Sequence, residues 1–494
     1  MPKATVHRLS KSKYVSGLQC PKLLWWQVHE PRSPELVPDP EQQYLFDRGH
    51  EVGRVAQSYV PGGVLIDVPH YARKHRLNKT AKAIREGAKV LYEAAFEHDG
   101  VIIVADILER IRGGWSVIEV KSSTRVKPQH IPDLAIQVHV LRGAGLKVRR
   151  AELMHLNREC QHPDLSNLFE REVVTEDVED LVPTVPKELR RLIRALKGSL
   201  PDVPIGDHCH DPYDCPFINR CWPEQLPNAI ETLYRIRRNR IESYEAAGYR
   251  TILDLPDEEN LTAIQDRQRR AAQRNRLVVE DGLASALDEF DPPFAYLDFE
   301  TIAPPIPVWK GCRPYDQIPV QLSVHRKPVR GRMIHHEWLT EGSGDPRKMV
   351  AKKLLEFTEG AETILAYHAP FERSCIQGLK KNLPSLARKL DAVENKIQDL
   401  LPVVRDHVYH PRFNGSFGLK SVAPTLVPEI DYEQLDVSGG GRASQMLYDL
   451  LLRSDTMKAA ETKRTRKGLL RYCKTDTKAL VELHKKLTRF ASGK

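Results

Sequence analysis

Residues 101–123 read VIIVADILERIRGGWSVIEVKSS, a pattern that predicts two strongly apolar β-strands joined by a short turn. Asp106 ends the first apolar run, and thirteen residues later the second strand carries Glu119 and Lys121. Residues two apart on a strand share a face, so we expect Glu119 and Lys121 to point together while Val120 packs behind them. Because polar groups are costly to bury between apolar strands, we expect these side chains to have a role.

The types of these side chains indicate a hydrolytic site. Asp106 and Glu119, on neighbouring strands, can hold a hard divalent cation, and the adjacent ammonium of Lys121 can orient an attacking water and offset phosphate charge. Phosphodiester hydrolysis needs this combination of groups. The alternative interpretation is a Glu–Lys pair on the surface of a hairpin.

The sequence around this hairpin predicts a mixed α/β core. Helices are expected over 42–60, near 80–98 and over 131–145, and a further strand over 148–157. The order of helix, hairpin, helix and strand is typical of an α/β core.

A second signal is the stretch CHDPYDCPFINRC, in which Cys209, Cys215 and Cys221 follow one another at six-residue intervals. In a protein expected to be cytosolic, the eight cysteines of the chain favour thiols or metal ligands over disulfides. Soft metals in proteins usually take four ligands, so a fourth ligand is expected elsewhere. Thiolates suit iron–sulfur clusters and zinc alike.

With these features, residues 1–222 resemble the PD-(D/E)XK nuclease superfamily, in its RecB-like branch that includes CRISPR-associated exonucleases with an iron–sulfur cluster. The resemblance implies that Cys20, in SGLQCPKLLW, joins the three later cysteines in binding a four-iron, four-sulfur (4Fe-4S) cluster. Cys160 is the competing fourth ligand. Zinc bound with His208 or His210 is the competing metal centre.

The same resemblance assigns the nuclease residues. It implies the catalytic residues Asp106, Glu119, Lys121 and Gln137, and the metal ligands Asp106, Glu119, Val120 and His50. The chain departs from the family pattern at the tyrosine position and offers a candidate for the upstream histidine. The motif that begins with Gln137 has Leu141 in place of the family's tyrosine. His50, in FDRGHEVGRVA, stands in the helix that often supplies a metal-binding histidine.

A second acidic constellation lies in the C-terminal part of the chain. The motif AYLDFETI places Asp298 and Glu300 on one face of a strand, and Glu372 follows at a strand-to-helix junction. Tyr472 and Asp476 are four residues apart and therefore share one face of the last helix. Four carboxylates converging on two cations could bracket a scissile phosphate, and the tyrosine hydroxyl could orient the attacking water.

These motifs make residues 294–490 resemble the DEDD exonucleases of the RNase H-like fold, in the subgroup that carries a tyrosine, and closest to an uncharacterised bacterial branch. The resemblance implies a site for Mg²⁺ or Mn²⁺ with the catalytic residues Asp298, Glu300, Glu372, Tyr472 and Asp476, the four acids also being metal ligands. Glu372 stands where the family usually has aspartate. Asp399 is the reserve candidate for that position. The alternative is an inactive RNase H-like domain that only binds nucleic acid.

Length and charge bound these expectations. A chain of 494 residues predicts two or three domains, here a nuclease core over 1–222, a helical linker over 223–290 and an RNase H-like domain over 291–494. A net charge of +9 favours a polyanionic partner. The N-terminus lacks the apolar segment of a secretory signal and no apolar run is long enough to span a membrane, so a cytoplasmic protein with no membrane partner is expected.

Three further segments could touch nucleic acid. The stretches GSFGLK and SGGGRASQ could present backbone N–H groups with Lys420 or Arg442 to phosphates, although ordinary loops would read the same way. Residues 241–256 look like the helix–turn–helix segments found beside RecB-like domains, although simple linker packing is equally compatible.

These features predict a metal-dependent nuclease with two hydrolytic sites, acting on DNA rather than RNA. The alternatives are a nucleic-acid-binding scaffold with one or both sites inactive, or an exonuclease directed at RNA. The chain lacks a phosphate-binding GxxxxGK[ST] loop, so no built-in ATP motor is expected, and a helicase or a defence complex is a candidate partner.

Overall fold

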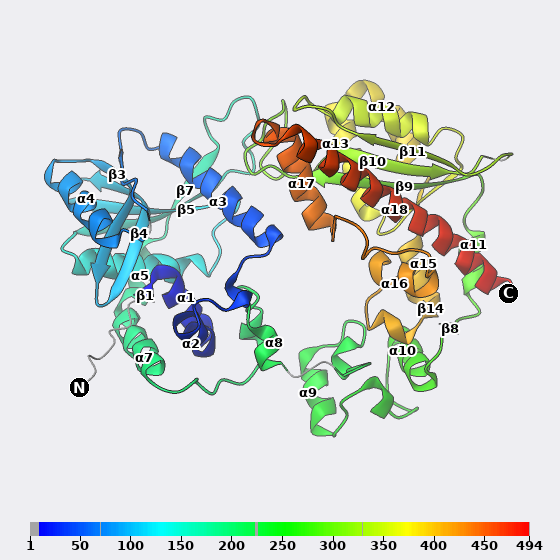
Figure 1. The fold of residues 1–494 in the computed structure, drawn as a ribbon, viewed down its shortest axis with the longest axis horizontal. Coiled ribbons are helices and arrows are strands. Elements are labelled where there is room, and N and C mark those ends of the chain that lie inside the picture. The colour runs from blue at the N-terminus through cyan, green and yellow to red at the C-terminus, as the bar shows by residue number, and fades with distance from the viewer. Residues whose placement is uncertain (1–8, 70, 223–225, 329, 494) are drawn as a thin grey trace. The chain divides into compact units, whose positions relative to one another are not determined.

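The computed structural model describes residues 9–69, 71–222, 226–328 and 330–493, and it divides into two compact units (Figure 1). Unit 1 comprises Met1–Glu224 and Pro305–Tyr315, and unit 2 comprises Gln225–Pro304 and Asp316–Lys494. The segment expected to be a separate helical linker therefore falls, from residue 225 onward, within unit 2. Each unit combines a mixed sheet with helices, which confirms the α/β class.

Unit 1 is built on a seven-stranded sheet in the order β2-β3-β4-β5-β6-β7, with β1 paired to β4. The hairpin predicted from residues 101–123 is present, because β4 and β5 pair antiparallel and Ile107 lies opposite Ile118. The next strand, β6, pairs parallel to β5 through the crossover helix α5. The strands are β1 (Leu9–Ser10), β2 (Val64–Leu65), β3 (Val90–His98), β4 (Val101–Ile111), β5 (Gly114–Lys121), β6 (Val148–Leu156) and β7 (Phe169–Val173).

Helices pack the main core of unit 1 against this sheet. Helix α7 shows why, since its apolar residues recur on one face and Leu189, Leu192 and Leu196 are all buried. The helices are α1 (Lys11–Gln19), α2 (Pro21–His29), α3 (Pro40–Ser58), α4 (Arg73–Arg85), α5 (His130–Gly143), α6 (Thr175–Leu181), α7 (Val185–Lys197) and α8 (Ile218–Cys221).

The helix predicted near residues 80–98 is confirmed only as far as Arg85 and is wrong beyond it. Helix α4 ends at Arg85, Gly87 adopts a left-handed φ of 85°, and β3 begins at Val90. The run VLYEAAF contains good helix formers, but nearly all of it is buried between β2 and β4. A short apolar run fits a buried strand as well as a helix, and here burial in the sheet decides.

Unit 2 contains a five-stranded sheet in the order β11-β10-β9-β12-β13. Its central strand β9 pairs antiparallel with β10 and parallel with β12, so the two neighbours of β9 run in opposite directions. A small second sheet pairs β8 with β14. The strands are β8 (Val278–Val279), β9 (Phe294–Ile302), β10 (Ile318–Arg326), β11 (Ile334–Leu339), β12 (Thr363–Ala366), β13 (Ile397–Asp399) and β14 (Val408–Tyr409).

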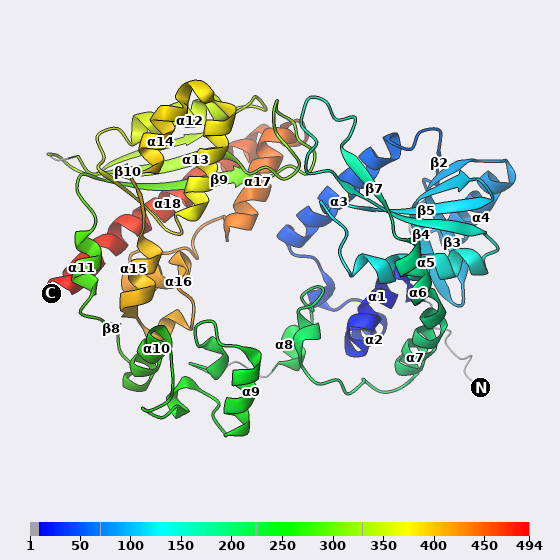
Figure 2. The same cartoon turned by 180° about the vertical axis from the view of Figure 1, so that it is seen from behind.

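Alternate residues of β9 face two different helical layers. Ala295, Leu297 and Phe299 join the core made with α12 and α13, whereas Tyr296 bonds His484 of α18 on the opposite face (Figures 1 and 2). Asp298 and Glu300 share the α18 side of this alternation. The helices are α9 (Arg238–Ala246), α10 (Ala263–Arg274), α11 (Leu283–Asp288), α12 (Arg347–Phe357), α13 (Pro370–Asn382), α14 (Ala387–Glu394), α15 (Leu400–His407), α16 (Leu419–Leu426), α17 (Gly440–Leu452) and α18 (Ala459–Ala491).

Among the described helices, none combines the length and apolar character required to cross a membrane. The first eight residues, part of the stretch from which a signal sequence was judged absent, lie outside the described residues.

Candidate functional site

The first acidic site forms on β4 and β5 of unit 1. Asp106 lies within β4, not at its end as predicted, and its Oδ2 accepts the backbone N–H of Val120 at 2.8 Å. Glu119 is 3% exposed, and its Oε1 accepts the Lys121 ammonium at 2.8 Å. The expected shared face of Glu119 and Lys121 is therefore present, and both side chains are directed into the protein.

Two further residues complete this site, and sequence reasoning missed them. Lys11, the first residue of α1, donates to Glu119 Oε1 at 2.7 Å and lies 3.3 Å from Asp133 on α5. Asp133 also accepts the Lys121 ammonium at 2.5 Å. Asp133 lies four residues before Gln137 in the sequence, and that spacing was a usable signal because it places both on one helix face. Lys11 had no such signal.

Two of the predicted metal ligands of this site, Asp106 and Glu119, have pKa values shifted in opposite directions. Burial, and then the charge of Glu119, raises the pKa of Asp106 to about 7. Burial alone would also raise the pKa of Glu119, but the ammonium groups of Lys11 and Lys121 outweigh it and hold that pKa below its ordinary value. A cation bound here would have to compete with these two lysines for Glu119.

The remaining residues assigned to this site are placed differently. Gln137 is fully buried and donates to Glu119 Oε2 at 2.7 Å, which gives it a clear positioning contact. Leu141, four residues later on α5, is buried in the apolar core. His50 is exposed on α3, and in the described part of the chain it makes no hydrogen bond or ion pair with Asp106 or Glu119.

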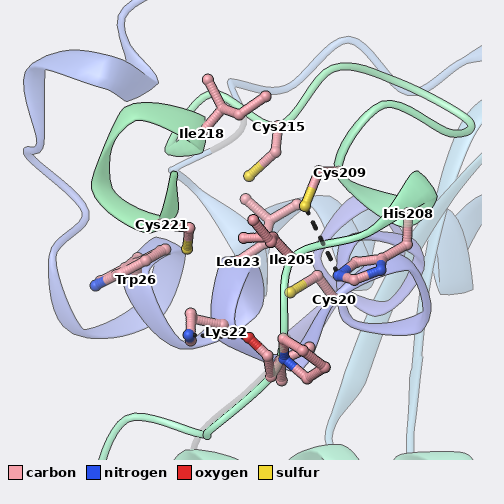
Figure 3. Close-up of a pocket in the computed structure, with 12 residues that line it drawn as sticks. Cys20, Lys22, Leu23, Trp26, Ile205, His208, Cys209, Cys215, Ile218 and Cys221 are labelled. Atoms are coloured by element: carbon pink, nitrogen blue, oxygen red, sulfur yellow. Dashed lines mark hydrogen bonds between the residues drawn. The ribbon is translucent and has the colours of Figure 1, made fainter. Parts of the chain in front are cut away.

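The four cysteines expected to act together line one pocket (Figure 3). Cys20 follows α1, and Cys209, Cys215 and Cys221 come from the segment before and within α8. The first three are buried, and Trp26 packs beside them. Burial, followed by the charge of the neighbouring thiols, raises the pKa of Cys215 to about 11.

The four cysteine sulfur atoms are not grouped as tightly as ligands around a single bound zinc ion would be. Four thiolates on one zinc ion lie about 3.8 Å apart, because each Zn–S bond is about 2.3 Å. Groups of three or more cysteine, histidine or acidic ligands within 4.8 Å occur in the described part of the chain, but none includes these cysteines.

Of the competing ligands Cys160 and His208, the first lies away from the cysteine pocket and the second lines it. Cys160 is completely buried in another small core with Val52 and Leu156 and bonds Asp164 through its sulfur. His208 lines the cysteine pocket, with its Nε2 3.9 Å from the Cys209 sulfur.

The second acidic site lies where β9 of unit 2 meets α18. Asp298 and Glu300 come from β9, and Asp476 from α18. Glu300 and Asp476 are 8% and 7% exposed. Burial, and then the charge of Asp476, raises the pKa values of Asp298 and Glu300 well above their ordinary values.

Glu372 and its reserve candidate Asp399 have different partners. Glu372, in the first turn of α13, is 2% exposed, and its Oε2 has no hydrogen-bond partner among the described residues. Burial raises its pKa to about 8. Asp399 instead accepts three backbone N–H groups, those of His368, Ala369 and Leu401, at 2.9–3.0 Å. Asp399 therefore serves as a local backbone acceptor, whereas Glu372 retains an unused buried oxygen.

Two tyrosines and a lysine surround Asp476. Tyr432 donates to Asp476 Oδ1 at 2.7 Å, and the predicted Tyr472 also hydrogen-bonds Asp476. The Lys420 ammonium lies 4.7 Å from the centre of the Tyr472 ring. Burial raises the pKa values of Glu300 and Asp476, and the charge of Lys420 offsets part of that rise. Lys420, from GSFGLK, thus belongs to this site and not to an unrelated loop.

Cys473 was not predicted as part of this site. Its thiol donates to Asp298 Oδ2 at 3.1 Å, and Asp298, Glu300 and Cys473 offer ligand atoms within 4.8 Å of one another. Its position beside Tyr472 in the motif gave no signal, because adjacent helix residues point in different directions.

Comparison with known protein families matches residues 295–418 to a family described as a Domain of unknown function (DUF2779). The matched region begins within β9 and includes Asp298, Glu300 and Glu372. No curated protein sequence matches the chain.

Proposed function

We propose that this chain is a metal-dependent nuclease acting on DNA, with one hydrolytic site in each unit and a 4Fe-4S cluster held by Cys20, Cys209, Cys215 and Cys221. The observation that carries the proposal is the group of buried acids in unit 2. Burial raises the pKa values of Asp298, Glu300, Glu372 and Asp476, and one Glu372 oxygen has no hydrogen-bond partner among the described residues. Such a cluster needs cations, and it fits Mg²⁺ or Mn²⁺, which prefer oxygen ligands.

The residues of unit 2 have distinct roles in this proposal. The four acids would hold the cations, which when bound would activate water and stabilise charge that develops on the phosphate. Tyr472 would orient the attacking water through its hydroxyl, while Asp476 fixes the hydroxyl's position. Lys420 would face the negative phosphate. The sheet order with β9 at its centre supports the RNase H-like fold inferred from sequence.

Unit 1 would supply the second hydrolytic site. Asp106 and Glu119 would be its metal ligands, Gln137 would hold Glu119 in place, and Lys121 would offset the phosphate charge. Lys11 and Lys121 already pair with Glu119, so a bound cation would have to compete with both ammonium groups. The net charge of +9 supports a polyanionic substrate, and the choice of DNA over RNA rests on the resemblance to RecB-like nucleases.

The experiment uses single strands of DNA and RNA labelled at the 5′ or the 3′ end, with Mg²⁺ or Mn²⁺ at low salt. Asp298→Asn should abolish loss of the 3′ label, and Glu119→Gln should abolish the remaining cleavage, each by orders of magnitude. Glu429→Gln and Glu176→Gln change exposed acids of the same two units and should leave both activities intact.

The outcomes separate the proposed activities. Metal-independent cleavage, or cleavage unchanged in both Asp298→Asn and Glu119→Gln, would contradict the proposal. Tight DNA binding without cleavage would instead identify a nucleic-acid-binding scaffold. Preferential cleavage of the RNA strand would assign RNA as the substrate.

A further inference from the structure

A third group of metal-ligand side chains lies in unit 1, apart from the residues assigned above. His98 is the last residue of β3, Asp99 follows in the turn to β4, and His139 lies on α5. One ligand atom from each residue lies within 4.8 Å of the other two. Two imidazoles and one carboxylate thus meet where a hairpin turn contacts a helix.

The carboxylate lies between the two imidazoles. Asp99 Oδ2 is 3.0 Å from His139 Nε2, and Asp99 Oδ1 is 3.4 Å from His98 Nε2. Tetrahedral zinc with Zn–N and Zn–O bonds of about 2.1 Å places its ligand atoms about 3.4 Å apart. The observed separations therefore need only small side-chain movements to accept such an ion. The Asp99 side chain is 50% exposed, which leaves a route for entry.

The backbone holds two of the three ligands in place. Asp99 and Gly100 have left-handed φ values of 48° and 76°, so the turn directs Asp99 back toward α5. The His98 ring lies directly over Gly143 of α5, where an added Cβ would come within 2.0 Å of a ring carbon. A larger residue at position 143 would displace His98. Glycine at this position therefore allows the hairpin and the helix to approach closely.

We propose that His98, Asp99 and His139 form a binding site for a divalent transition-metal ion of the zinc class. Imidazole nitrogen with one carboxylate favours zinc, cobalt or nickel over magnesium, which prefers oxygen ligands alone. The bound ion joins the β3–β4 hairpin to α5. That helix also carries Asp133 and Gln137, so the ion fixes the helix that supports the first acidic site.

The simpler interpretation is a hydrogen-bonded Asp–His pair that binds no metal. The number of zinc ions bound per chain distinguishes a metal site from a metal-free Asp–His pair. All variants compared keep the other candidate metal centres, so those centres contribute equally to each measurement. The test uses the full-length protein, stripped with EDTA and then equilibrated with Zn²⁺. Wild type, Asp99→Asn, His139→Ala and His75→Ala are compared, and His75→Ala removes an exposed histidine of α4 as a matched control.

Wild type and His75→Ala should each bind one zinc ion per chain more than Asp99→Asn and His139→Ala. In isothermal titration, the two site variants should lose the corresponding binding phase or weaken it at least tenfold. Asparagine tolerates left-handed φ, so Asp99→Asn preserves the turn and decides the question if His139→Ala fails to fold. Equal zinc content and equal titrations in wild type and Asp99→Asn would overturn the proposal. Neither result depends on nuclease activity.

Discussion

The buried Glu372 gives a quantitative prediction for the metal-free protein. Its carboxyl is 2% exposed, and its pKa of about 8 lies above the ordinary value of 4.5 because of burial. Between these two values the folded chain keeps a proton that the unfolded chain releases. The stability that this group contributes is therefore fully present below about pH 4.5 and is lost as the pH rises toward 8.

The magnitude follows from the size of the shift. A difference of about 3.5 pKa units at about 1.4 kcal/mol per unit corresponds to about 5 kcal/mol. Glu372→Gln keeps the shape of the side chain and removes the titration. We therefore expect the free energy of unfolding of metal-free unit 2 to fall with pH in the wild type by about 5 kcal/mol more than in the variant. At pH 8 the metal-free variant should be the more stable protein.

The assay is urea unfolding from pH 4.5 to 8 in EDTA, read by hydrogen exchange of peptides from β9 and α13 so that unit 2 is followed alone. Mn²⁺ should restore stability to wild type at pH 8 and much less to Glu372→Gln. The control Glu429→Gln should behave as wild type, because residue 429 is exposed. Parallel pH curves for wild type and Glu372→Gln would refute the assignment of Glu372 as a buried, uncompensated carboxyl.

Three further predictions concern unit 1. Cys215→Ala should bleach the brown colour of anaerobically purified protein, while Cys160→Ala should keep it; stoichiometric zinc in a colourless wild type would exclude the cluster. Lys121→Met should reduce cleavage by orders of magnitude in an Asp298→Asn background with folding preserved, and an unchanged rate there would remove Lys121 from catalysis. Lys11→Met should strengthen Mn²⁺ binding about tenfold in the same background, because one competing ammonium is lost, and weaker binding in a calorimetric titration would contradict that competition.

The acids of unit 2 could be predicted from sequence because local spacing fixes their directions. Asp298 and Glu300 are two apart on a strand, and Tyr472 and Asp476 are four apart on a helix, so each pair shares a face wherever those elements pack. The apolar residues around each pair then identify the face as buried. Spacing alone could not favour Glu372 over Asp399, and the choice came from the family resemblance. In the structure the backbone contacts of Asp399 distinguish the two residues.

Other features depend on contacts between distant segments and left no local pattern. Lys11 reaches Glu119 across 108 positions of sequence, and an isolated lysine near an N-terminus gives no indication of this contact. The error over residues 80–98 has the same origin, because helix-forming residues become a strand only once their neighbours in the sheet are present. Sequence spacing also could not predict that His98 and His139 lie close together. Their proximity arises only because the β3–β4 hairpin packs against α5 in the folded chain.

Helix α1 connects the cysteine pocket to the first acidic site. Lys11 is its first residue, and Cys20 directly follows its last, so about 14 Å of rigid helix separates them. A ligand that fixes Cys20 against Cys209 and Cys215 therefore also restrains the helix that presents the Lys11 ammonium to Glu119. With the proposed cluster bound, the cysteines would therefore influence the geometry of the acidic site without contacting it.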